Sequence, residues 1–87
     1  MDIRIEPHTL QRAEERGTNM AEILDVLATG VSVSARPGRK GKAKVYTFDQ
    51  ERLGRFYRQK RVEVIYTEER EVFITVTVYV FFGEWEA

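Results

Sequence analysis

The last third of the chain contains a strict two-residue alternation that runs from Val72 to Phe82. One set of positions is apolar throughout: Val72, Ile74, Val76, Val78, Val80 and Phe82. The other set carries aromatic and hydroxyl side chains: Phe73, Thr75, Thr77, Tyr79 and Phe81. Successive side chains of a β-strand point to opposite faces of a sheet, so the pattern predicts a strand with one covered face and one partly open face.

The open face of this strand has two interpretations. Hydroxyl and aromatic residues are common on solvated sheet faces, and we favour that explanation for Thr75. For Tyr79, near the end of the strand, we give equal weight to a solvated surface role and a functional role. The apolar face, in contrast, requires a second layer to cover it.

That second layer is predicted at the beginning of the chain. Ile3 and Ile5 alternate with charged residues and suggest a short opening strand. Pro7 suits the first turn of a helix, where its missing N–H is not needed. Gly17 suits the left-handed residue that ends a helix, so we expect the first helix at residues 7–16.

The second helix has the stronger pattern. Asn19 and Glu22 have the spacing of a capping box, with Thr18 as the competing cap, and Gly30 is expected to end the helix. Between them, apolar residues recur at helical spacing: Met20, Ile23, Leu24 and Leu27. We expect this apolar side to pack on the sheet.

After Gly30 the apolar spacing changes to alternation, which predicts strands. We expect strands at 31–35, 45–48, 56–67 and 72–82, a basic loop at 36–44, a turn at 50–54 and a hairpin connection at 68–71. The predicted fold class is α+β. One domain, residues 1–87, has two N-terminal helices packed on one face of a curved, mainly antiparallel sheet of about four strands.

The net charge of zero hides an asymmetry along the chain. Residues 1–30 carry a net charge of −3, residues 31–61 a net charge of +8 and residues 62–87 a net charge of −5. A middle third this basic predicts a polyanion-binding surface. The alternative is that its lysines and arginines form ion pairs with the acidic thirds and protect exposed sheet edges.

Several classes of site and location are disfavoured. The chain has no cysteine, which fits a reducing cytoplasm, and a single histidine, which does not specify a metal site. Its longest apolar stretch, 72–82, is well short of the roughly 20 residues of a membrane helix. The N-terminus lacks the apolar region of a secretory signal. We therefore expect a cytoplasmic protein with no cofactor, no metal and no membrane association.

The first helix carries His8, Arg12 and Arg16 at four-residue intervals, followed at once by Gly17. This spacing places the three side chains along one side of a helix. One imidazole and two guanidinium groups there predict an anion site. The alternative is structural, because Arg12 can pair with Glu15 one turn away and Arg16 with other acidic groups.

Three segments together carry a resemblance to a known family. The stretch PHTLQRAEERG (7–17), the helix NMAEILDVLATG (19–30) and the strand ending VTVYVFFG (76–83) resemble a bacterial domain family of unknown function. Its pattern is a helix H-x-x-x-R-x-x-x-R-G with a closing T-V-Y strand, which Thr77 and Tyr79 match. That family is similar to the RelE/ParE and BrnT toxins, in which two helices pack against an antiparallel sheet.

The resemblance implies cleavage of RNA without a metal, by attack of a ribose 2′-hydroxyl on the adjacent phosphate. Arg12 and Arg16 would clamp the phosphate, and His8 would act as base or acid. The other proton transfer, or extra charge stabilisation, would come from Lys60, Arg61 or Tyr79. The resemblance also implies a cognate antitoxin as a partner.

The basic middle third would then bind RNA. The predicted nucleic-acid-binding residues are Arg36, Arg39, Lys40, Lys42, Lys44, Arg58 and Arg61. The aromatic residues expected to stack on unpaired bases are Tyr57, Phe73, Tyr79 and Phe81.

A competing hypothesis starts from Trp85, a large apolar ring close to the end of the sequence. Such a ring is buried either against its own core or in a partner. The alternative function is therefore a non-catalytic interaction module on the same fold, which forms a homodimer through Trp85 or the last strand.

Overall fold

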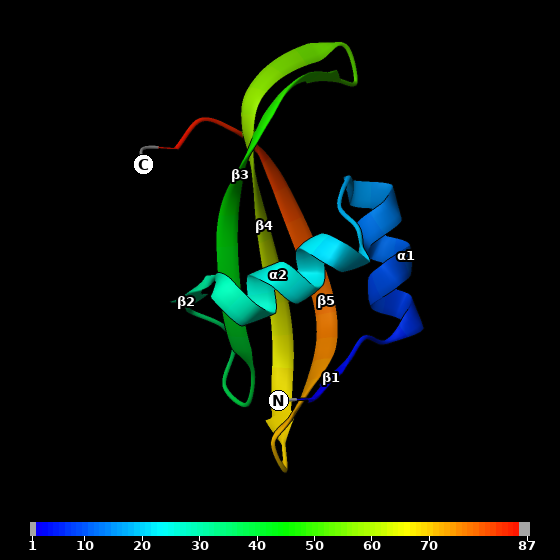
Figure 1. Cartoon of the computed structure of the whole chain (residues 1–87), viewed down its shortest axis with the longest axis vertical. Coiled ribbons are helices and arrows are strands. Elements are labelled where there is room, and N and C mark those ends of the chain that lie inside the picture. The colour runs from blue at the N-terminus through cyan, green and yellow to red at the C-terminus, as the bar shows by residue number, and fades with distance from the viewer. Residues whose placement is uncertain (1, 86–87) are drawn as a thin grey trace.

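A computed structural model describes residues 2–85 of the chain (Figure 1). The elements follow one another in the order β1 (Asp2–Arg4), α1 (Pro7–Arg16), α2 (Met20–Thr29), β2 (Val31–Val33), β3 (Lys40–Arg52), β4 (Arg55–Glu69) and β5 (Val72–Gly83). No helix in the part of the chain so described is long and apolar enough to cross a membrane.

All the strands belong to one sheet, in the order β1-β5-β4-β3-β2. The β1–β5 pairing is parallel, and the other three pairings are antiparallel. The predicted α+β class with two N-terminal helices is confirmed, but the sheet is mixed and has five strands rather than about four. The difference lies at one edge, where β1, the short opening strand suggested by Ile3 and Ile5, joins the sheet beside β5 with three residues.

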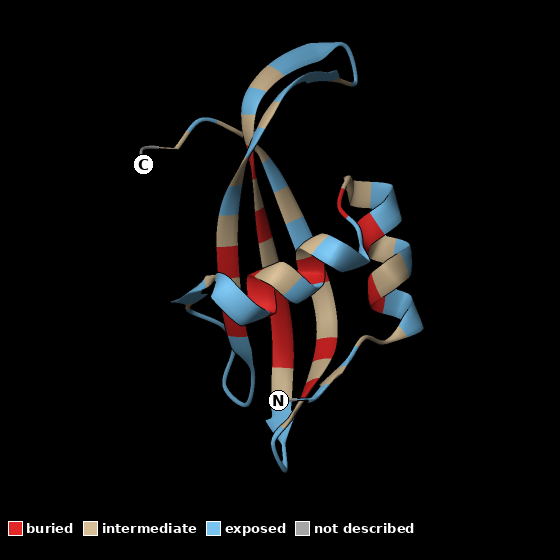
Figure 2. Ribbon diagram, in the orientation of Figure 1, coloured by how far each residue is buried: buried red, intermediate tan, exposed pale blue. Residues whose placement is uncertain are grey.

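The core lies between the helices and one face of the sheet. α1 contributes Ala13, and the other buried members of the cluster come from α2, β4 and β5: Ile23, Val26, Leu27, Val62, Val64, Tyr66, Phe73 and Val78. In Figure 2 α2 crosses β4 and β5, and the buried parts of these strands lie behind the helix and on either side of it. The opposite face of the sheet carries no helix, so side chains on it are accessible unless a loop covers them.

Local signals set the helix boundaries. Pro7 begins α1, and Gly17 ends it with a left-handed backbone at φ 94°. The Asn19 side chain accepts a hydrogen bond from the Glu22 backbone N–H at 2.9 Å, so one half of the predicted capping box is confirmed. The Glu22 carboxylate instead accepts a hydrogen bond from the Thr18 hydroxyl at 2.7 Å.

β3 and β4 are longer than the sequence pattern indicated, whereas β2 ends at Val33 and is shorter than the predicted strand at 31–35. β3 includes residues 40–44, which were predicted as loop, and residues 50–52, which were predicted as turn. Its connection to β4 is the two-residue turn Leu53-Gly54, and β4 connects to β5 through Arg70-Glu71. All four turn residues have positive φ, as hairpins of the primed type require.

One part of the β3–β4 hairpin extends beyond the rest of the sheet. The pairing of β4 with β5 ends at Gln59, which lies opposite Gly83. Beyond that point the hairpin has no third strand among the described residues, so residues 50–57 pair only with one another. We call residues 50–57 the arm; it projects from one end of the molecule in Figure 1. The Arg52 guanidinium holds the arm to the body by donating to the Glu15 carbonyl at 3.1 Å.

A bulge in β5 changes the predicted face assignment. Ile65 pairs with Thr77, but the next residue, Tyr66, pairs with Thr75, so Val76 is an extra residue in β5. The bulge shifts the alternation by one position. Odd-numbered residues, Phe73 and Thr75, are buried before it in the sequence, and an even-numbered residue, Val78, is buried after it. The prediction of one unbroken apolar face was therefore wrong.

Thr75 is accordingly not on a solvated face, contrary to the prediction, and is only 2% exposed. Its hydroxyl accepts a hydrogen bond from the Glu6 backbone N–H at 3.0 Å and donates one to the Thr9 hydroxyl at 2.9 Å. This pair of bonds connects β5 to the beginning of α1.

We expect Thr75→Val to lower the free energy of unfolding by about 1–3 kcal/mol, because the partly buried Glu6 N–H loses its acceptor while the side-chain volume is kept. Denaturant unfolding measures the change. Thr47→Val, on an exposed position of β3, is the matched control and should change stability by less than about 0.5 kcal/mol. Equal stability of the two variants would contradict the structural role of Thr75.

Candidate functional site

The three residues of the predicted helix motif, His8, Arg12 and Arg16, lie in three different environments. His8 is exposed and takes part in none of the side-chain hydrogen bonds or ion pairs seen within residues 2–85. Arg12 forms an ion pair with Glu15 at 3.2 Å, as the structural alternative expected. Arg16 points elsewhere and donates to the Val78 carbonyl at 2.7 Å. The three side chains therefore do not form one shared oxyanion pocket.

Arg16 does meet another predicted residue. Its guanidinium lies over the ring of Tyr79, 5.1 Å from the ring centroid, in a cation–π contact. The edge of β5 explains this position, since β1 pairs only with residues 72–74 and leaves the Val78 carbonyl available to Arg16. The structure thus brings the end of α1 to the open face of β5.

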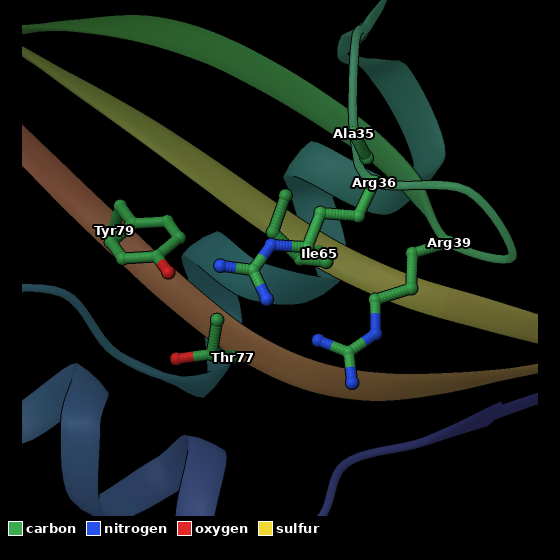
Figure 3. A pocket seen from close by; sticks show the side chains of 6 residues that line it. All are labelled: Ala35, Arg36, Arg39, Ile65, Thr77 and Tyr79. Carbon is green, nitrogen blue, oxygen red and sulfur yellow. The ribbon is translucent and has the colours of Figure 1, made fainter.

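Tyr79 also lines a cavity of about 240 Å³ on that open face (Figure 3). The other residues lining this cavity are Ala35, Arg36, Arg39, Ile65 and Thr77. Figure 3 shows the Arg36 and Arg39 side chains extending from the loop across the sheet toward β5. We call this cavity the arginine pocket.

The other predicted nucleic-acid-binding residues are engaged by the protein itself. Four of them form ion pairs: Lys40 with Glu68 (2.8 Å), Lys44 with Asp25 (2.7 Å), Arg58 with Glu84 (3.4 Å) and Arg61 with Glu63 (2.7 Å). Lys42 donates to the Leu27 carbonyl at 2.9 Å. The ion-pair interpretation of the basic third is therefore confirmed for these four residues, while Arg36 and Arg39 have no acidic partner among the described residues.

Lys60 lies on the opposite side of the sheet from Tyr79. It is 8% exposed, and its ammonium donates to the Gly17 carbonyl at 2.9 Å and to Glu22 at 2.7 Å. Lys60 is two residues before Val62 and four before Val64, both buried, so the three side chains lie on the same face of β4, under the helices. The structure does not bring Lys60 together with Tyr79.

The predicted stacking residues also divide between the faces. Phe73 is buried and packs on Tyr66 with ring centroids 4.5 Å apart, so it offers no surface for a base. Tyr57 is half-buried against Phe82. Tyr79 and Phe81 remain, 42% and 46% exposed, with nearly parallel rings whose centroids are 6.4 Å apart.

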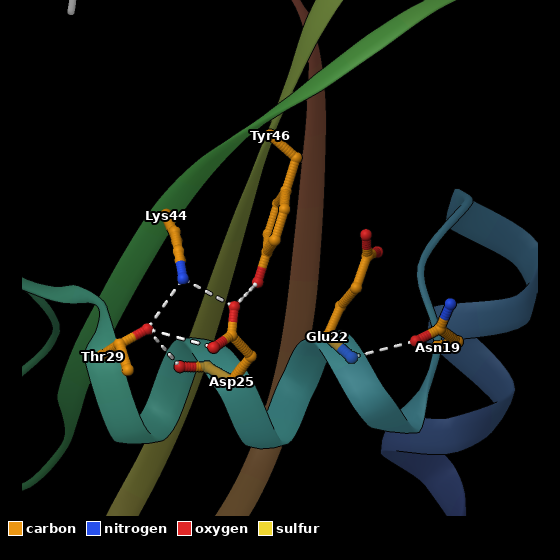
Figure 4. A network of polar contacts seen from close by, with 6 residues as sticks. All are labelled: Asn19, Glu22, Asp25, Thr29, Lys44 and Tyr46. Carbon is orange, nitrogen blue, oxygen red and sulfur yellow. Dashed lines mark hydrogen bonds and ion pairs between the residues drawn. The ribbon is translucent and has the colours of Figure 1, made fainter.

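A polar network that the sequence patterns did not predict connects α2 to β3 (Figure 4). Asp25 accepts hydrogen bonds from Lys44 at 2.7 Å, Tyr46 at 2.5 Å and Thr29 at 3.2 Å. The hydrogen bonds from Lys44 and Tyr46 lower the pKa of Asp25, while burial and the Asp25 carboxylate raise the pKa of Tyr46. The alternation along β3, with Lys44 and Tyr46 on one face, was the available signal.

This network fastens α2 to the sheet through one ionised carboxylate. The pKa of Asp25 is lower in the folded protein than its ordinary value of 3.8. Its contribution to stability is therefore present above that value and is lost as pH falls through the lower folded pKa.

We expect Asp25→Asn to unfold at a lower temperature than the unmodified protein near pH 7, and the difference to shrink below about pH 4. Thermal unfolding followed by circular dichroism at a series of pH values measures this. Asp49→Asn removes a carboxylate from an exposed position of β3 and serves as the control. A constant difference between the Asp25 variant and the unmodified protein at every pH would contradict the assignment.

Comparisons bear on neither the fold nor the site: no family model, curated protein or solved structure matches this chain. Among residues 2–85 there is also no group of three or more His, Cys, Asp or Glu side chains that could hold a metal ion. The arginine pocket and the adjoining Tyr79–Phe81 surface bring Arg16, Arg36 and Arg39 close to exposed aromatic rings, and we take them as the candidate functional site.

Proposed function

We propose that this domain binds RNA through the open face of its sheet. The observation that carries the proposal is the position of three guanidinium groups beside one exposed aromatic ring. Arg16 lies over Tyr79, and Arg36 and Arg39 line the same cavity as Tyr79. None of the three arginines forms an ion pair with an acidic side chain of residues 2–85.

The two kinds of group suit the two parts of a nucleotide. Guanidinium groups donate in a planar fork that matches phosphate oxygens. Exposed aromatic rings stack on bases without requiring a particular sequence. Tyr79 and Phe81 offer two such rings in succession along β5, so a single strand of RNA could follow that strand.

The proposal extends to cleavage of the toxin type, with a RelE-like fold, a cytoplasmic location and an antitoxin partner. Arg16 would stabilise charge on the scissile phosphate, and the Tyr79 hydroxyl would transfer a proton. His8 lies two helical turns from Arg16, about 12 Å along the axis, and Arg12 lies between them. A phosphate held at Tyr79 is therefore remote from His8, and the geometry supports binding more strongly than cleavage.

A homodimerising, non-catalytic module is the second candidate. It is favoured by the edge of β5 that faces away from β4, where residues after Ile74 pair with no further strand of the described chain, and by the exposed Phe81. Trp85 adds little, because its backbone N–H donates to the Gln59 side chain at 2.6 Å and its ring lies near Gly83 of the same chain. A monomer in light scattering at high concentration would contradict this candidate.

The RNA-binding proposal predicts a strong dependence on salt. The affinity for a short single-stranded RNA, measured by fluorescence anisotropy, should fall steeply between about 50 and 200 mM salt. Replacing both Arg36 and Arg39 by Gln should reduce the slope of log affinity against log salt by about 1.4, since each phosphate contact on a single strand contributes about 0.7.

Arg55→Gln supplies the matched control for that titration. It removes one exposed positive charge from the tip of the arm, away from the arginine pocket. We expect its slope to stay close to that of the unmodified protein. An affinity of the unmodified protein that does not change with salt would contradict the proposal.

The cleavage extension has a separate test. Production of the unmodified protein in bacterial cells should slow growth, and Tyr79→Phe, which removes the hydroxyl assigned to proton transfer, should relieve that effect. Tyr79 is 42% exposed, so the variant should fold, which circular dichroism would check. Equal, harmless growth with both proteins would contradict the enzyme and leave the binding proposal to the salt titration.

A further inference from the structure

The two arginines of the arginine pocket belong to a single tight turn. The Arg39 backbone N–H donates to the Arg36 carbonyl at 3.0 Å, and Gly38 has a φ of 82°. Pro37 at the second position and a glycine of positive φ at the third are the requirements of a type II turn. Such a turn brings the Cα atoms of its first and fourth residues within about 7 Å of each other. The backbone therefore holds Arg36 and Arg39 side by side.

Hydroxyl groups complete the other side of the cavity. Thr77 and Tyr79 contribute them from β5, and the Ile65 side chain, which is almost fully buried, lies between the loop and β5. In Figure 3 the two guanidinium groups, the Tyr79 hydroxyl and the Thr77 side chain border the same space. The cavity thus combines charged donors with neutral donors, which is the combination that phosphate oxygens accept.

Within the described part of the chain, no acidic side chain lines the arginine pocket to neutralise Arg36 and Arg39. One acidic side chain, Glu63, lies opposite Tyr79 in the ladder, but Arg61 engages it at 2.7 Å. Two guanidinium charges therefore face the cavity. A phosphate inside an RNA strand carries one negative charge, whereas a phosphate monoester carries close to two at neutral pH because its second pKa is about 6.

We propose that the arginine pocket is a phosphate monoester subsite, which accepts the terminal phosphate of an RNA strand or the phosphate of a free nucleotide. The inference rests on the proposed function only for the RNA strand; the pocket itself would bind a nucleotide without it. Arg36 and Arg39 bind the phosphate oxygens, and Thr77 and Tyr79 donate to the remaining ones.

The test compares ligands that differ only in the terminal phosphate. The probes are one fluorescent pentaribonucleotide with a 5′-phosphate, the same strand with a 3′-phosphate, the strand with hydroxyls at both ends, and unlabelled uridine 5′-monophosphate as competitor. We expect a phosphate-ended strand to bind about tenfold more tightly than the hydroxyl-ended strand at pH 7.5. The preference should decline at pH 5, where the monoester carries a single charge.

Two variants and a control assign the preference to the pocket. Arg36→Gln and Arg39→Gln should each remove most of the preference for the phosphate-ended strand, while Arg55→Gln should retain it. Tyr79→Phe, which keeps the ring but removes a hydroxyl, should reduce it. Because Arg36 and Arg39 are both exposed, these variants should fold, and thermal unfolding would confirm that they do.

The outcomes separate the subsite from the RNA-binding proposal. Equal, salt-dependent binding of all the strands would overturn the subsite and leave RNA binding intact. Binding of uridine 5′-monophosphate that depends on Arg36 and Arg39, with no binding of the strands, would support the subsite and overturn RNA binding. No binding of any probe would overturn both.

Discussion

Two lysine side chains on the covered face of the sheet connect α2 to the strands beneath it. Lys44 reaches Asp25, and Lys60 reaches Glu22, so ammonium–carboxylate pairs fix α2 to β3 and to β4. Lys60 is almost completely buried, and a buried charge that lost its partner would be strongly destabilising. The position of α2 therefore depends on these pairs as well as on its apolar residues.

The same arrangement divides the basic residues between the two faces of the sheet. Lysines of β3 and β4 are used on the covered face, where their flexible stems pack under the helices. Arginines border the open face, where Arg36, Arg39 and Arg16 lie near Tyr79. The neutral net charge of the chain hides this division, because much of the acidic charge is engaged by the protein's own cations.

The helices were predictable because short-range signals define them. Pro7, Gly17, Asn19 and Gly30 mark boundaries that agree with α1 and α2 within about one residue. The strands were less predictable, because the polar residues of the arm and of 40–44 resemble a loop until a long hairpin pairs them. The bulge at Val76 has no signal in the alternation, since valine suits either face.

The candidate site was predictable only in part. The contact of Arg16 with Tyr79 joins two residues that the resemblance had singled out, whereas Arg12 pairs within its own helix. Lys60 could have been assigned to the covered face from its parity with Val62. The pairing of Arg36 with Arg39 in one turn could have been inferred from the sequence Arg-Pro-Gly-Arg, but its position over β5 depends on tertiary structure.

The arm has a different physical character from the sheet that it extends. It has two strands, no third strand beside it and an almost fully solvated tip, where Leu53 is 95% exposed. A two-stranded ribbon without a packed face is only marginally stable. Its amide hydrogens should exchange with solvent through local opening, at a lower free energy than those of β4 under α2, and the arm is then the compliant end that we expect of this domain.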